Sequence, residues 1–254
     1  MSCQKLLSDM RKADEMFNLI NDGDYIGVGL SGGKDSSLLM YMLKMYQYLF
    51  NNVYGGNFKI IGIHINLNFG EDDMSDLWKW FDENELEYYS EDSEIADILG
   101  YHLKNDRIDC SLCSKLKKGA VIKAAKKLGC NKVAFGHHAD DALETMMMNM
   151  IYGGRIATFD PKMYLDDSGI TFIRPFSMSF ESDISKTAKE LQIPVVSSGC
   201  PNDGYTKRAD MKEMLHHVYH NYPGSKENLL KSIYNKEQLN LYMDKIEKKP
   251  NHHD

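Results

Sequence analysis

The stretch that decides the fold is Leu30-Ser31-Gly32-Gly33-Lys34-Asp35-Ser36, which joins two apolar runs. The first run, residues 25–30, predicts a buried strand, and the second, residues 37–43, predicts a helix packed on a sheet. Two adjacent glycines allow a sharp turn whose N–H groups can approach a ligand. These groups, the helix N-terminus and Lys34 together favour an anion. We interpret the loop as a phosphate cradle, although it lacks the Walker A spacing; a plain strand-to-helix turn is the alternative.

The residues of this loop resemble the PP-loop of the adenine-nucleotide alpha-hydrolase-like ATPases. Members of that superfamily cleave ATP between the α- and β-phosphates and hold the pyrophosphate in this loop. The resemblance implies that ATP contacts these loop residues: Leu30, Ser31, Gly32, Gly33, Lys34, Asp35 and Ser36. By the same analogy adenine lies at the end of the second strand, near His64. His64 can equally be a histidine that is hydrogen-bonded within its strand.

Composition indicates a soluble globular protein with room for one large α/β domain and a small appendage. The chain has 254 residues, of which 43% are hydrophobic and 26% charged. We find neither a run of eighteen apolar residues nor a signal-peptide pattern, so we expect a cytoplasmic protein with no membrane partner. Five cysteines without an export signal favour thiols or metal ligation over disulfides.

The charge is unevenly distributed along the chain. The net charge of −7 argues against a nucleic-acid partner, but residues 71–97 hold twelve acidic residues and one lysine. Residues 114–128 hold six lysines and no acidic residue. A basic face therefore keeps RNA possible, while a solvated helix face is the simpler interpretation of these lysines.

Strand and helix patterns alternate, which predicts a doubly wound, mostly parallel, Rossmann-like α/β sheet. Strands are expected at residues 25–30, 58–67, 87–90, 132–136, 170–175 and 193–196. Helices are expected at residues 4–21, 37–43, 71–81, 120–128, 140–152 and 182–191. Two further helices within residues 210–243 predict a C-terminal helical appendage. We divide the chain into a PP-loop domain at 1–205 and a helical extension at 206–254.

A second motif runs from Gly136 to Thr145 and follows a buried strand, as the first motif does. Two acids in the first turn of a helix stabilise its N-terminus, which is the purely structural interpretation. The functional interpretation is that one carboxylate holds Mg²⁺ or a proton. The pattern G-H-H-x-D-D-x-x-x-T resembles the second signature of PP-loop tRNA-modifying enzymes. The resemblance implies nucleotide contacts from Gly136, His137 and Asp141 and a catalytic role for Asp140. Parallel strands place both motifs at one edge of the sheet.

Cys110 and Cys113 form a C-x-x-C pair, which we place on a loop before the basic helix. The pair alone is ambiguous among zinc, iron–sulfur and dithiol chemistry. Cys200, just after the expected strand at 193–196, is a third candidate ligand or a small buried apolar residue. Three thiolates would leave one iron of a 4Fe–4S cluster without a protein ligand, so that an exogenous hydrosulfide could bind there.

PP-loop, C-x-x-C, G-H-H-x-D-D and a late cysteine, in this order, resemble the tRNA 2-thiocytidine synthetase family almost end to end. The resemblance implies a 4Fe–4S cluster on Cys110, Cys113 and Cys200. It also implies catalytic roles for Lys117, Asp140 and Asp35, with ATP and Mg²⁺ as cofactors. Partners implied are tRNA, a cysteine desulfurase or inorganic sulfide as sulfur donor, and a second copy in a homodimer. The family usually has a second late C-x-x-C, where this chain keeps one cysteine.

The family resemblance implies a two-step thiolation. ATP adenylates a carbonyl oxygen of the acceptor, sulfur then attacks the same carbon, and AMP leaves. Lys207 and Arg208 are candidate contacts to RNA phosphates. Three alternatives remain at this point: an AMP-forming ligase or amidase, thiolation of a small molecule, and an ATP-independent cluster protein.

Overall fold

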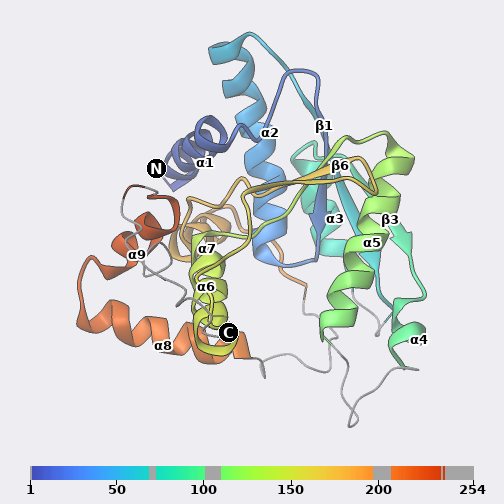
Figure 1. The fold of residues 1–254 in the computed structure, drawn as a ribbon. Helices are drawn as coiled ribbons and strands as arrows, with labels where there is room; N and C mark the ends of the chain where they lie inside the picture. Colours follow the sequence, from blue (N-terminus) through green and yellow to red (C-terminus); the bar gives the residue numbers. More distant parts are fainter. Residues whose placement is uncertain (1, 69–72, 101–109, 197–206, 236, 238–254) are drawn as a thin grey trace, which may run out of the picture. The chain divides into compact units, whose positions relative to one another are not determined.

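The computed structural model describes residues 2–68, 73–100, 110–196, 207–235 and 237 (Figure 1). Six strands form one sheet in the order β3-β2-β1-β4-β6-β5. The strands are β1 (Tyr25–Leu30), β2 (Lys59–Asn66), β3 (Tyr88–Asp92), β4 (Lys132–Ala134), β5 (Lys162–Leu165) and β6 (Ile170–Ile173). The helices are α1 (Ser2–Phe17), α2 (Lys34–Tyr54), α3 (Ser75–Glu83), α4 (Ile95–Gly100), α5 (Cys110–Leu128), α6 (Ala139–Gly153), α7 (Glu181–Glu190), α8 (Lys207–Asn221) and α9 (Ser225–Tyr234).

The strand order creates a switch point between β1 and β4. From β1 the chain builds β2 and β3 on one side, then returns to place β4 on the other side of β1. All neighbouring strands are parallel except β5 and β6. The predicted α/β class with a mostly parallel sheet is confirmed. In such sheets ligands bind beyond the carboxyl ends of the strands at the switch point. Both sequence motifs begin there.

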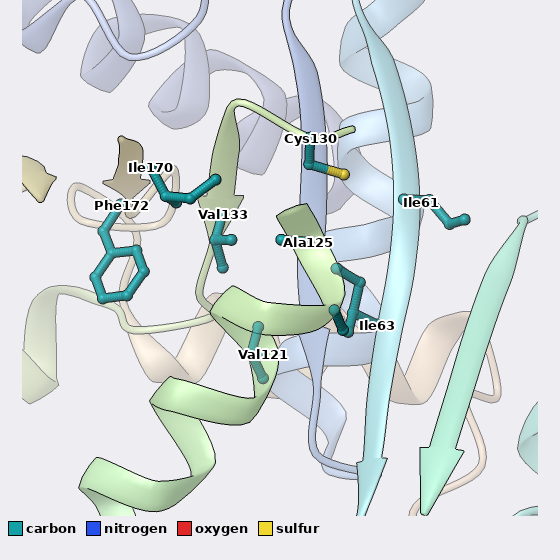
Figure 2. Packing of buried hydrophobic residues seen from close by; sticks show 9 residues of the cluster. Ile61, Ile63, Val121, Ala125, Cys130, Val133, Ile170 and Phe172 are labelled. Carbon is teal, nitrogen blue, oxygen red and sulfur yellow. The ribbon is translucent and has the colours of Figure 1, made fainter. Parts of the chain in front are cut away.

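Helix α5 covers the middle of the sheet because its small residues allow close packing. Figure 2 shows part of this core, in which side chains of α5 meet those of the strands. The cluster consists of Ile61, Ile63, Val121, Ala124, Ala125, Cys130, Val133, Ile170 and Phe172. Strand β1 contributes Gly27 here, and a Cβ on it would lie 2.5 Å from Ile63 Cδ1. The core therefore brings β1 and β2 into close contact below the first motif.

Three local predictions differ from the structure. The C-x-x-C pair does not lie on a loop: α5 begins at Cys110, and no glycine or proline interrupts the helix before Gly119. Residues 193–196 are not a strand, because Pro194 lacks an N–H and β6 already pairs with β4 and β5. The antiparallel strand β5 and the short helix α4 were not predicted, since each is too brief to show a clear period.

The chain divides into two compact units, residues 1–212 and 213–254. The predicted boundary after residue 205 lies outside the described residues. The first unit contains the whole sheet and both motifs. The second contains most of α8 and all of α9, separated at residues 222–224 as the sequence predicted. No helix in the described ranges is long and apolar enough to span a membrane.

Candidate functional site

The first motif forms a tight loop between β1 and α2. Gly32 has a φ of +77°, a conformation that favours glycine, and Gly33 is the N-cap of α2. The Ser31 N–H donates to Ser36 Oγ at 3.1 Å, and Ser37 Oγ donates to the Gly33 carbonyl at 3.1 Å. These bonds close the loop on itself without a side-chain cap on α2. The open helix N-terminus is suited to bind phosphate.

Lys34 and Asp35 face each other at the start of α2. Lys34 Nζ lies 3.2 Å from Asp35 Oδ1 and 3.5 Å from Glu181 Oε1. Glu181 in turn accepts from Lys212 Nζ, with 2.7 Å between Nζ and Oε2. The charges of Lys212 and Lys34 outweigh burial and hold the pKa of Glu181 below its usual value. The carboxylate of Glu181, at the start of α7, therefore forms an ion pair with the lysine of the phosphate loop.

The second motif lies directly against the first. A Cβ on Gly136 would lie 3.0 Å from the carbonyl carbon of Asp35 and 3.1 Å from the Ser36 nitrogen. Only glycine allows the chain that leaves β4 to approach the first turn of α2 so closely. The two motifs therefore meet at the switch point, as the parallel sheet predicted.

His138 and Asp141 cap helix α6 reciprocally. The Asp141 N–H donates to His138 Nδ1 at 3.4 Å, and the His138 N–H donates to Asp141 Oδ2 at 2.9 Å. Asp141 Oδ1 also accepts from Arg208 at 3.0 Å. Both oxygens of Asp141 accept hydrogen bonds within the protein, so this acid stabilises the N-terminus of α6. Its contact with a nucleotide stays a prediction.

Asp140 is buried beside the capping pair, with 6% of its surface exposed. Its Oδ2 accepts a hydrogen bond from the backbone N–H of Glu181 at 2.7 Å. Glu181 therefore connects both motifs, through its carboxylate to Lys34 and through its backbone to Asp140. Sequence analysis missed Glu181, because a glutamate at the start of a helix is an ordinary N-terminal residue.

Glu144 is a second residue that sequence analysis did not single out. It lies one helical turn after Asp140, is 4% exposed, and has Arg208 Nε at 3.9 Å from its Oε2. Burial and the neighbouring charge of Asp141 raise the pKa of Glu144 to about 7, against the opposing charges of Arg208 and Lys212. Buried Glu144, Asp141 and the half-exposed Arg208 form a polar cluster on the first turns of α6.

The two predicted histidines have different surroundings. His64 is buried on β2, with its Nδ1 3.0 Å from Ser90 Oγ, so it is hydrogen-bonded within the sheet. His137 packs against Phe159, with 5.3 Å between ring centres. Burial lowers the pKa of His137 to about 4. A nucleotide contact from either histidine remains a prediction.

Two of the three candidate cysteine ligands fall outside what can be described: the side chain of Cys110 and the whole of Cys200. Cys113 is buried against Ile95 and Leu99 of α4, near the carboxyl end of β2. Lys117 is half-buried on α5, one turn after Cys113. Among the described residues, no three potential ligands gather around one point.

The segment that leads to Cys200 is attached to the first motif. The Val196 N–H donates to the Gly32 carbonyl at 3.0 Å. Cys200 lies four positions after Val196, and an extended chain of four residues spans at most about 14 Å. The covalent chain therefore sets an upper limit on the distance between Cys200 and the phosphate loop.

Comparison with known proteins now defines the class. A family model described as PP-loop domain matches residues 6–216. A tRNA-cytidine(32) 2-sulfurtransferase of Dechloromonas aromatica is 30% identical over 86% of this chain and 75% of the relative. One from Ralstonia pickettii, with the same name, is 32% identical over 91% of this chain and 72% of the relative.

Among solved structures, the U34-tRNA thiolase NcsA from Methanococcus maripaludis, with its 4Fe–4S cluster, has a similar fold. The TM-score is 0.69 at 23% identity, over 89% of this chain and 76% of that one. The chain belongs to the PP-loop family, and within it to the family of the tRNA-cytidine(32) 2-sulfurtransferases.

Proposed function

We propose that this chain is an ATP-dependent tRNA sulfurtransferase that replaces the 2-oxygen of a cytidine with sulfur. The observation that carries the proposal is the meeting of the two motifs at the switch point, where Gly136 lies against Asp35 and Ser36. Relatives named for this reaction match the chain over most of its length. These relatives are named for cytidine 32 of tRNA, and we propose the same position here.

The first step is adenylation. The 2-oxygen of the base attacks the α-phosphorus of ATP, a new P–O bond forms, and the bond to the β-phosphate breaks. The loop N–H groups and Lys34 stabilise charge on the departing pyrophosphate. The start of α2 adds its partial positive charge at the same place. The groups that stabilise the departing pyrophosphate are therefore in position before the reaction begins.

The second step replaces oxygen. A sulfur nucleophile forms a bond to C2 of the base, the C–O bond breaks, and AMP leaves with the former carbonyl oxygen. No net oxidation occurs when the donor supplies sulfur as sulfide. Lys117 would stabilise the adenylated oxygen, and Asp140 would hold Mg²⁺ or a proton beside it, as the family resemblance implies.

Magnesium fits the first motif. Asp35 Oδ1 is buried and accepts no hydrogen bond from the described residues, although Lys34 Nζ is 3.2 Å away. Carboxylate oxygens of this kind are the ligands that Mg²⁺ prefers. Asp35 would hold the ion, with Asp140, a buried carboxylate of the second motif, as a second candidate ligand.

A 4Fe–4S cluster on Cys110, Cys113 and Cys200 would, when bound, supply an iron without a protein ligand that can present sulfur. Three observations fit it. Cys110 and Cys113 are one helical turn apart at the start of α5. Cys113 lies in an apolar cluster. Val196, four positions before Cys200, is hydrogen-bonded to Gly32 of the phosphate loop. We also propose a homodimer and, as sulfur donor, either inorganic sulfide or a cysteine desulfurase, whose persulfide sulfur must be reduced by two electrons from an external thiol to reach the sulfide level.

The test is anaerobic purification followed by reaction with a tRNA transcript, ATP and sulfide. We expect a brown protein with about four irons per chain, AMP formation, and 2-thiocytidine detected by nucleoside mass spectrometry. A Lys34→Gln variant is the control for the ATP step. A colourless protein that forms AMP would instead indicate a ligase or amidase, and iron without ATP turnover would indicate an ATP-independent cluster protein.

A further inference from the structure

Arg174 follows β6 directly and is buried, with 4% of its surface exposed. Asp160 is a nearby carboxylate, but burial outweighs its charge and lowers the pKa of Arg174. Among the described residues, no carboxylate lies within ion-pair distance of the guanidinium. Its Nη1 donates to the Asp160 carbonyl, its guanidinium lies 4.7 Å from the centre of the Phe159 ring, and its Nε has no hydrogen-bond partner there. A buried guanidinium is costly without a counter-charge. This arrangement suits an anion supplied from outside the chain.

His137 approaches the same aromatic ring from the end of β4. Its ring centre is 5.3 Å from that of Phe159, and its Nδ1 is buried without a hydrogen-bond partner in the described part of the chain. Strands β4 and β6 are parallel neighbours, with Ala134 beside Ile173. His137 and Arg174 therefore follow adjacent strands at the same edge of the sheet. Two unsatisfied nitrogens flank one ring.

Lys118, on helix α5, adds a second cationic group beside Arg174, while His137 is neutral near pH 7 and offers a ring nitrogen. Burial of its ammonium and the nearby charge of Arg174 lower the pKa of Lys118. The charges of Lys118, Arg174 and Arg208 likewise help to lower the pKa of His137. Lys118 is exposed and His137 is half-buried, so the cluster opens to solvent on their side. Within the described ranges, the carboxylate whose charge acts on His137 is Asp141, which is already paired with Arg208.

We propose that Arg174, His137 and Lys118 bind a phosphate group, at a site next to the PP-loop and distinct from it. The PP-loop already offers Lys34 and its own N–H groups to ATP, which leaves this second cationic site for a phosphodiester of the RNA acceptor. The site rests on the proposed function for the identity of its ligand. Lys118 belongs to the helix that begins with the C-x-x-C pair, five residues after Cys113, and His137 belongs to the second motif.

The test is equilibrium binding of a tRNA transcript and, separately, of ATP, to the full chain and to Lys118→Gln and Arg174→Gln variants. We expect tRNA affinity to fall three- to tenfold in each variant, with a salt dependence shallower by about one unit and ATP affinity unchanged. Lys126→Gln, on the exposed part of the same helix, is the matched control and should bind tRNA normally.

The outcomes separate the possibilities. Loss of ATP affinity with unchanged tRNA binding would overturn the RNA assignment and give the phosphate to ATP. No change in either would overturn the site. If Arg174→Gln does not fold, Lys118→Gln carries the test, with Arg174→Lys as a milder variant. Binding is measured independently of the thiolation assay described above. An enzyme that fails that assay but still binds tRNA through Lys118 would refute the proposed reaction and keep the site.

Discussion

Glu181 Oε1 lies 3.5 Å from Lys34 Nζ, a contact between residues 147 positions apart in sequence. Lys34 is the lysine that should meet the phosphates of ATP, so Glu181 competes with the nucleotide for it. Lys212 holds the other oxygen of Glu181 at 2.7 Å and keeps the carboxylate in place. The loop lysine is thus already paired before any phosphate arrives.

We expect Glu181→Gln to bind ATP two- to fivefold more tightly, because the loss of a partly exposed ion pair is worth about 0.4–1 kcal/mol. Isothermal titration with a non-hydrolysable ATP analogue measures this. Glu190→Gln, at the other end of α7, is the control. Weaker binding by Glu181→Gln would mean instead that Glu181 orients Lys34 toward the nucleotide.

Gly136→Ala should weaken ATP binding about tenfold, a change of about 1.4 kcal/mol. The added methyl would meet the backbone of Asp35 and Ser36 at 3.0–3.1 Å, and backbone atoms cannot move aside as a flexible side chain can. Gly119→Ala is a matched control, since nothing lies within 4 Å of its Cβ position on helix α5. Both variants should fold, as judged by thermal unfolding. An unchanged ATP affinity in Gly136→Ala would separate the second motif from the nucleotide site.

The stability of the protein should depend on the ionisation of Glu144. The folded-state pKa, about 7, lies above the unfolded value, so folding favours the protonated acid. Its contribution is complete below pH about 4.3 and is lost as the pH rises through about 7, up to about 3 kcal/mol. Glu144→Gln should remove this part of the pH dependence.

Urea unfolding at several pH values between 5 and 8 measures this contribution. The exposed Glu83 provides the comparison, because Glu83→Gln should keep the slope of the parent protein. Equal slopes in Glu144→Gln and the parent would show that Glu144 is ionised in the folded state throughout this range.

Cys130 and Cys113 are both buried, but only Cys113 belongs to the candidate cluster. Burial raises the pKa of the Cys130 thiol to about 11, as for a core residue. We expect Cys113→Ser to lose most of its iron and Cys130→Ser to keep it. Cys130→Ser should lower the free energy of unfolding by about 1–3 kcal/mol, because its hydroxyl lies among apolar side chains.

Iron determination and absorbance of anaerobically prepared protein distinguish these two cysteine variants. Equal iron loss in both would point to a general effect on folding. Retention of iron by Cys113→Ser would remove Cys113 from the ligand set.

The sequence predicted the elements with strong local patterns. The run at 25–30 and the loop after it form the expected strand and phosphate loop, because alternating apolar residues and paired glycines act over a few positions. Contacts between distant segments were not predictable in the same way. Nothing in the sequence indicates that Glu181 contacts Lys34 or that Arg208 contacts Asp141. Only the folded chain brings each pair together. Lys207 and Arg208 were considered for RNA phosphates, yet Arg208 is paired with Asp141.

The hydrogen bond between Val196 and Gly32 has a consequence for the spacing of the chain. It anchors the chain four positions before Cys200, so the number of residues in between, and not their identity, limits how far from Gly32 this thiol can be placed. Conservative changes in the stretch should be tolerated. Inserting or deleting a residue there would change the maximum distance between the Cys200 thiol and the phosphate loop. Neither motif would be altered.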